Sequence, residues 1–341
     1  MKPDTPFLTI VIPVFNGAPY LRDAIESVMA QSDPPAELYV LDNASTDETP
    51  TVLAEALAAS PPVPIRVDRN PETIPGPANW ARAATGVRTP FFSVLPADDT
   101  IEPAFAASVR RALIARPDAE FLFCCAFHAM NAAGEVTKLR DFRDPRWTGA
   151  ADRQAFLDRL CKGMPFSPAG VVLAKEAYDR VGGYDAGFAG TFDYDFFLRI
   201  CGQARGLYGL EEPLARCRYH DRSWTSGQHL DGPPDLERLL SKLGGYDFLS
   251  ESQKRSVVEG ACDVVRQTVS RRLRTPEIGD VAILKARKNA EARLRRWQTQ
   301  FPEISQFVRI APTPGNPMLL WHASRWRLLI PLIRDLLCRY R

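Results

Sequence analysis

Over its first 120 residues the chain alternates between short apolar runs rich in β-branched side chains and segments whose apolar residues recur at helical spacing. Residues 7–12 form the first apolar run, which stops at Pro13 and is typical of a strand buried in a parallel sheet. Further strands are predicted at 37–41, 65–67 and 91–95, and helices at 21–29, 51–59, 78–84 and 103–114. Such alternation predicts an α/β fold with a mostly parallel central sheet.

The chain changes character after this region. From residue 121 the alternation weakens, and Gly232-Pro233-Pro234 precedes segments with mainly helical patterns. Residues 271–341 hold 15 Lys and Arg against 5 Asp and Glu, whereas the rest holds 28 against 36. We therefore predict an α/β domain at 1–232 and a helical, basic C-terminal extension at 233–341. The net charge of +2 combines an acidic body with this basic tail.

Composition excludes several protein classes. With 45% hydrophobic and 25% charged residues, the chain resembles neither a collagen nor a disordered or multi-span membrane protein. Its apolar runs are shorter than the 18 residues that suggest a spanning helix, and its start lacks the apolar run of a signal peptide. The seven cysteines are odd in number and have no CxxC spacing, which argues against a disulfide scaffold and a zinc site. We expect a cytoplasmic protein in a reducing compartment.

Three loops follow predicted strands, at the sheet edge where α/β proteins bind ligands. Residues 13–17 could present backbone amides and an aromatic ring to a planar base, or be a plain turn. Asp42 follows the second strand, where a carboxylate can accept a hydrogen bond from a ring N–H, while Ser45 or Asp47 could simply cap a helix. The adjacent Asp98 and Asp99 could bind a hard cation, or form a turn before a helix.

These loops resemble those of the family 2 glycosyltransferases, which have the GT-A fold. The resemblance rests on Val-Ile-Pro-Val-Phe-Asn-Gly at 11–17, Asp-Asn-Ala-Ser-Thr-Asp at 42–47, Ala-Asp-Asp at 97–99, the loop and helix start at 70–79, the segments at 166–168 and 181–185, Phe-Asp-Tyr-Asp-Phe-Phe-Leu-Arg at 192–199 and Arg-Tyr-His-Asp-Arg-Ser at 218–223. Each motif is weak to moderate alone, but their order and spacing are jointly specific over about residues 7–226.

The resemblance implies an inverting glycosyltransferase that moves a sugar from a nucleotide-sugar donor, UDP- or dTDP-linked, to a hydroxyl of a glycan or lipid-linked acceptor. It implies a divalent cation, Mn²⁺ or Mg²⁺, held by Asp99 and His220. It implies that Asp193 is the general base, with Asp195 as the alternative. The residues expected to bind the donor nucleotide are Pro13, Val14, Phe15, Asn16, Asp42, Asn79, Asp98 and Arg218.

Two positions depart from the family pattern. Pro96 stands where the metal motif usually has its first Asp, and Phe192 stands where a Glu usually precedes the catalytic Asp. A catalytically degenerate protein that binds a sugar nucleotide or a partner is therefore the main alternative. A nucleotidyltransferase is disfavoured because the first loop has no basic residue before Arg22. Nucleic-acid binding is disfavoured because the body is acidic and has no recognised module.

The last 25 residues combine aromatic, basic and leucine-rich positions. Trp321, Trp326 and Tyr340 are interleaved with arginines, and Pro331 would kink or restart the helix. This composition suits a peripheral contact with an anionic membrane surface, on the inner face for a cytoplasmic protein. The same leucines could pack on the protein body or on a second subunit of a homo-oligomer, and we favour this packing interpretation.

Overall fold

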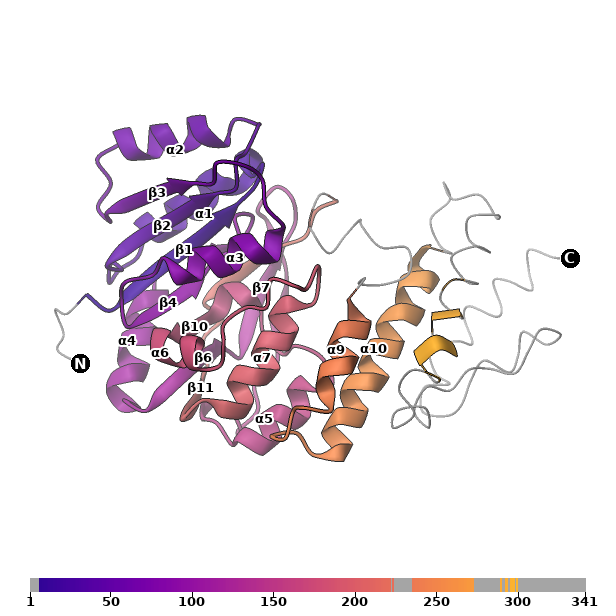
Figure 1. Cartoon of the computed structure of the whole chain (residues 1–341). Coiled ribbons are helices and arrows are strands. Elements are labelled where there is room, and N and C mark those ends of the chain that lie inside the picture. The colour runs from indigo at the N-terminus through magenta and orange to yellow at the C-terminus, as the bar shows by residue number, and fades with distance from the viewer. Residues whose placement is uncertain are drawn as a thin grey trace, which may run out of the picture.

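The computed structural model describes residues 6–221, 223 and 235–272, together with residues 289, 292, 293, 295–297 and 299. The predicted domain boundary at 232/233 and the aromatic segment at 317–341 lie outside these residues. Figure 1 shows a central sheet with helices on both faces, and helices α9 (Leu236–Leu243) and α10 (Glu251–Arg272) beside α7 (Phe192–Gln203).

In the described part of the chain, eight strands form the central sheet, in the order β3-β2-β1-β4-β10-β6-β11-β9. Their bounds are β1 (Leu8–Val14), β2 (Glu37–Asp42), β3 (Ile65–Arg69), β4 (Phe91–Val94), β6 (Ala119–Cys124), β9 (Gly149–Ala150), β10 (Val171–Ala174) and β11 (Gly206–Leu210). Strands β1 to β4 run parallel, whereas β10 lies antiparallel to both β4 and β6. All residues of β1 are buried, because β2 and β4 flank it and helices cover both faces.

Alternate residues along the strands belong to two buried hydrophobic clusters, one on each face of the sheet. Ile10 and Ile12 point to the face covered by α1 (Ala18–Met29), α2 (Thr49–Ala58) and α4 (Phe105–Ala115). Val11 points to the other face. That face is covered by α3 (Gly76–Thr85), α5 (Arg153–Leu160), α6 (Lys175–Arg180) and α7 (Phe192–Gln203). The predicted α/β class with a mostly parallel sheet is confirmed.

A second, four-stranded sheet has the order β5-β12-β7-β8. Its strands are β5 (Thr100–Ile101), β7 (Ala126–Met130), β8 (Val136–Asp141) and β12 (Ala215–Arg218). Strand β12 pairs with β5, which begins directly after Asp99. This pairing brings residues 215–220 to the loop after β4, although more than 100 residues separate them in sequence.

The helices after residue 235 continue the core of the body. Leucines of α9 (Leu236–Leu243) and valines of α10 (Glu251–Arg272) belong to the same buried cluster as α5 and α7. Figure 1 shows α9 and α10 packed side by side next to α7. Helical structure is thus present in the described part of the predicted extension.

The eight elements predicted up to residue 115 are all present, with ends that differ by a few residues. The helix expected from 103 begins instead at Phe105, because the carbonyl of Pro103 accepts hydrogen bonds from the amide and hydroxyl of Ser32. Cys124, Cys125, Cys161, Cys201 and Cys217 are free thiols. Among the described residues, no helix is both long and apolar enough to span a membrane.

Candidate functional site

The loop after β1 is tied to the loop after β2 by hydrogen bonds. The Asn16 amide donates to Ser45 Oγ (2.9 Å), and Asn16 Oδ1 accepts from the Thr46 amide (2.8 Å). Asn16 has a left-handed backbone (φ +49°), a conformation that asparagine tolerates better than most residues. A Cβ at Gly17 would lie 2.5 Å from Val14 Cγ2, so a larger residue here would displace the buried side chain of Val14. Within the turn the ring of Phe15 is 49% exposed.

Asp42 ends β2 with its carboxylate buried. The carboxylate accepts from the Ser45 amide (3.0 Å) and forms an ion pair with Arg69. Arg69 also donates to the Ser45 carbonyl (2.8 Å), so one guanidinium binds both ends of the loop. Sequence reasoning missed Arg69, although a signal exists: it ends β3, and the parallel register places it opposite Asp42.

Three buried asparagine side chains connect the loops after β2 and β3 to α3. Asn70 Nδ2 donates to Asn43 Oδ1 (2.7 Å) and to Asn79 Oδ1 (2.9 Å). Asn43 in turn bonds both the amide and the carbonyl of Ile74. The predicted donor-side residue Asn79 therefore fixes the loop at 70–76 beside Asp42.

The two acids after β4 have different partners. Asp99 is buried and accepts the Arg218 amide (2.8 Å), and burial together with the neighbouring Asp98 charge raises its pKa well above the ordinary value. Asp98 Oδ2 lies 3.0 Å from His220 Nε2. The predicted metal pair was Asp99 and His220, but the structure places the imidazole against Asp98.

Arg218 is buried, and its guanidinium donates to protein groups: the Asp98 carbonyl (2.8 Å), the Ala132 carbonyl (3.0 Å) and Asp23 Oδ2 (2.7 Å). The sequence predicts that Arg218 contacts the donor. In the structure its guanidinium links the Asp98 loop to Asp23 of α1. The structure gives Arg218 a role in holding the loop, and its contact with the donor stays a prediction.

A carboxylate and an imidazole are donors that Mn²⁺ accepts readily, so Asp98 and His220 fit part of a divalent-cation site. Within the described ranges no cluster of three or more His, Cys, Asp or Glu side chains is present. The oxygen atoms of a nucleoside diphosphate would have to complete the coordination shell.

The helix α7 presents two acids in its first turn, with different surroundings. The half-buried Asp193 accepts the amide of Tyr194 (2.8 Å), and among the described residues no side chain forms a hydrogen bond or ion pair with it. Burial raises the pKa of Asp193 to about 6, the nearby charge of Asp235 adds to the rise, and backbone hydrogen bonds oppose it.

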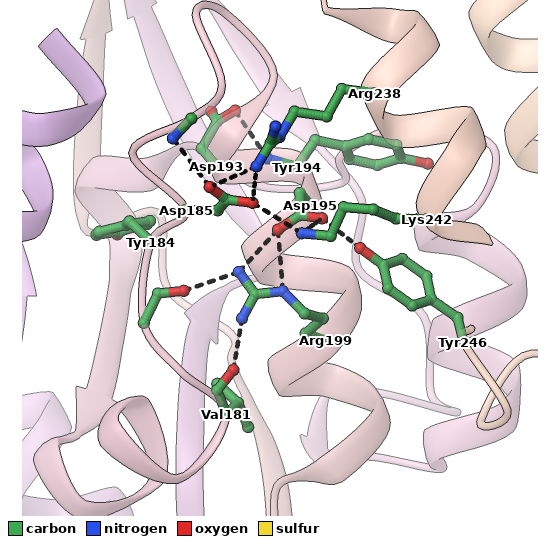
Figure 2. A network of polar contacts seen from close by, with 12 residues as sticks. Val181, Tyr184, Asp185, Asp193, Tyr194, Asp195, Arg199, Arg238, Lys242 and Tyr246 are labelled. Atoms are coloured by element: carbon green, nitrogen blue, oxygen red, sulfur yellow. Dashed lines mark hydrogen bonds and ion pairs between the residues drawn. The ribbon is translucent and has the colours of Figure 1, made fainter. Parts of the chain in front are cut away.

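Asp195 is fully buried and saturated by partners (Figure 2). It accepts from Arg199 Nε (2.9 Å) and Nη2 (2.7 Å), and lies 2.8 Å from Lys242 Nζ. The hydroxyl of Tyr246 also donates to it. Lys242 and Tyr246 were missed because their only sequence signal is an amphipathic leucine pattern around them.

Phe192, which replaces a Glu of the family pattern, is an apolar packing residue. Its ring lies edge-on to Trp80 (centroids 5.3 Å) and Tyr184 (5.4 Å). The start of α7 is therefore held by aromatic contacts on this side.

Comparison with known proteins gives a consistent set of relatives. Residues 9–160 match the family described as Glycosyl transferase family 2. The O-antigen biosynthesis protein RfbC of Myxococcus xanthus is 26% identical over 223 residues, 65% of this chain. The chain spans only 16% of the length of RfbC.

Two solved structures are similar in fold. TarS of S. aureus in complex with UDP-GlcNAc has a TM-score of 0.63 at 13% identity, over 89% of each chain. The mannosyltransferase PcManGT of Pyrobaculum calidifontis, in complex with GDP-Man and Mn²⁺, has a TM-score of 0.52 at 14% identity, over 90% of this chain and 86% of that one. These likenesses confirm the expected GT-A fold.

Proposed function

We propose that this chain, whose residues 9–160 match glycosyl transferase family 2, transfers a sugar from a nucleotide-sugar donor to a hydroxyl of a glycan or lipid-linked acceptor. One observation carries the proposal. The two acids of α7 differ in their partners: Asp195 is saturated by Arg199, Lys242 and Tyr246, whereas Asp193 has no side-chain partner among the described residues. Asp193 is thus available to accept a proton.

We propose that the nucleotide lies against the loops after β1, β2 and β3. The exposed ring of Phe15 offers a face for stacking, and the Asp42–Arg69 pair offers both a hydrogen-bond acceptor and donors to the base. The similarity to TarS in complex with UDP-GlcNAc supports a uridine donor, with a dTDP-linked sugar as the alternative.

We propose that Asp98 and His220 hold a divalent cation beside the diphosphate, with Asp99 supporting the loop. When bound, the cation would act as a Lewis acid and stabilise the charge of the leaving diphosphate. The similarity to PcManGT, whose complex contains Mn²⁺, supports this part of the proposal.

In the proposed reaction, Asp193 takes the proton of the acceptor hydroxyl as its oxygen attacks the anomeric carbon. Attack from the side opposite to the diphosphate inverts the anomeric configuration. Burial serves this role because it raises the pKa of Asp193 toward neutrality, where a carboxylate becomes a stronger base. We assign Asp195 to holding α7, since its oxygens are already occupied by partners.

We also propose a cytoplasmic setting, which the free thiols of the described cysteines support. Peripheral membrane contact or a homo-oligomer through residues 317–341 stays a prediction, because this segment lies outside the described residues.

Calorimetry tests the donor site. The full chain is titrated with UDP-GlcNAc, a dTDP-sugar and GDP-Man, each with and without Mn²⁺. We expect Asp42→Ala to weaken binding of the preferred donor under both conditions, and Asp98→Ala to remove only the part of the affinity that depends on Mn²⁺. The exposed Asp118, which pairs with Arg116, offers Asp118→Ala as a matched control. Equal affinity of both site variants and wild type for every donor would contradict the assignment.

A further inference from the structure

Asp235 lies just before α9 and contacts the segment that leads into α7. Its Oδ2 accepts the amide of Ala189, the amide of Gly190 (2.9 Å) and the amide of Thr191 (3.3 Å). Three consecutive amides that point at one site form an anion-binding nest, and here the bound anion is the Asp235 carboxylate of the same chain. Asp235 as a residue is buried, with a relative exposure of 9%.

Thr191 is the residue from which α7 starts. Its carbonyl accepts the first helical hydrogen bond, from the amide of Asp195 (3.0 Å), but its own side chain makes no capping bond. Asp235 does not cap the helical amides themselves, but it places a carboxylate and its negative charge on the three amides that lead into α7, close to the positive end of the helix. Asp193 lies two residues after Thr191, so the nest sets the place of its backbone.

The same C-terminal segment holds this region at further points, as Figure 2 shows. Arg238 (2.9 Å) and Lys242 (3.2 Å) contact Asp185, which lies in the segment before α7. Lys242 and Tyr246 contact Asp195 within α7. The Asp193 carboxylate remains outside all of these contacts.

We propose that Asp235 is a positioning residue of the transfer reaction, which places Asp193 by holding the three amides that lead into α7. The inference rests on the proposed role of Asp193 as the general base. It makes α9, which begins beyond the predicted transferase domain, a required part of the active site.

The charge of Asp235 has a second consequence that a purely mechanical contact would lack. Like charge in the vicinity disfavours ionisation, and Asp235 contributes to the raised pKa of Asp193. Among the described residues, the other ionisable groups of this region are Tyr184, from the turn before α7, and those labelled in Figure 2: Asp185, Tyr194, Asp195, Arg199, Arg238, Lys242 and Tyr246. The cations among them are paired with Asp185 and Asp195.

Two variants of the full chain separate position from charge. Asp235→Asn keeps an oxygen that can accept the amides but removes the charge, whereas Asp235→Ala removes both. Glu251→Gln is the matched control, because Glu251 is also an acid at the start of a C-terminal helix but is exposed. Melting curves identify any variant that does not fold.

The first readouts need no substrate. Carboxyl NMR of protein labelled at aspartate follows the titration of Asp193, whose signal is identified by its absence in Asp193→Asn. We expect the titration to move to lower pH in Asp235→Asn, and hydrogen exchange at residues 189–195 to accelerate in Asp235→Ala. An unmoved titration, or exchange equal to that of Glu251→Gln, would overturn the inference.

Turnover with the donor found by calorimetry completes the test. Misplacement of a catalytic group costs up to about 100-fold, so we expect kcat of Asp235→Ala to fall roughly 10- to 100-fold with unchanged donor affinity. In Asp235→Asn the midpoint of the pH–rate profile should fall. If Asp193→Asn is fully active, the proposed base is wrong, yet the titration and exchange still decide whether Asp235 places Asp193. If Asp193→Asn is inactive and Asp235→Ala turns over like wild type, only the positioning inference fails.

Discussion

At the scale of single residues, two acids that are two positions apart on one helix have different surroundings, and the proposed reaction gives them separate tasks for that reason. Asp193 accepts one backbone amide, while Asp195 accepts from a guanidinium, an ammonium and a phenol. The family resemblance implies Asp193 as the base with Asp195 as the alternative, but it gives no physical reason for that order. The division follows from Lys242 and Tyr246, which arrive from a later segment.

We predict that Asp193→Asn keeps donor binding and loses turnover by about 10²- to 10⁴-fold, because an amide cannot accept the hydroxyl proton. In the wild type only the deprotonated acid can act. Since the pKa of Asp193 is raised to about 6, kcat/KM should rise with pH through about pH 6 and then level off. A pH series of initial rates checks this. A profile that stays flat through that range, or near-full activity of Asp193→Asn, would contradict the assignment.

At the scale of elements, the central sheet places the loops after β1, β2 and β3 next to one another, and the second sheet places residues 218–220 next to the loop after β4. Two contacts of the candidate site follow from strand pairing: Arg69 meets Asp42 through β2 and β3, and Arg218 meets Asp99 through β12 and β5. Helix α9 acts in the same way on α7. The site is therefore assembled by register and packing of elements.

We predict that Asp195→Asn destabilises the joint between α7 and α9. The substitution leaves Arg199 and Lys242 facing a neutral group in a buried place, which costs about 3 kcal/mol. Urea unfolding followed by circular dichroism measures the loss. The control is Asp179→Asn, whose pair with Lys175 is exposed and should contribute less than about 1 kcal/mol. A variant that is as stable as wild type but inactive would instead support Asp195 as the base.

At the scale of the whole molecule, the C-terminal helices share a buried core with the sheet. Leu240 of α9 and Phe197 of α7 belong to one cluster that also includes Phe121 of the central sheet. An extension that shares a core in this way is expected to unfold together with the body rather than independently of it.

We predict that Leu240→Ala lowers the free energy of unfolding by about 2–4 kcal/mol, because it leaves a cavity in this shared core. Hydrogen exchange should show reduced protection in α7 as well as in α9. Leu57→Ala, on the exposed side of α2, is the control and should change stability by less than about 1 kcal/mol. Loss of protection confined to α9 would show that the helix unfolds on its own.

Much of the N-terminal half follows from the sequence by itself. Strands such as β1 are mostly apolar because both faces of a parallel sheet are covered. The run of apolar residues is contiguous in the sequence, so the strand can be predicted from the sequence alone. Position at a strand end likewise singled out Asp42, Asp98 and Asp99. The family resemblance rests on the order of the motifs. It predicted the GT-A fold and the glycosyltransferase class, and the comparisons support both.

Only the tertiary structure decided which partners these residues have. The ion pair of Asp42 with Arg69, the contact of His220 with Asp98 and the burial of Arg218 each join segments that are 27 or more residues apart. Asp235 is the extreme case, since nothing in its local sequence relates it to the amides of residues 189–191, 44 to 46 positions earlier. Hydrophobic period and turn residues specify local structure, but the partner of a polar group depends on which elements the shared core brings together.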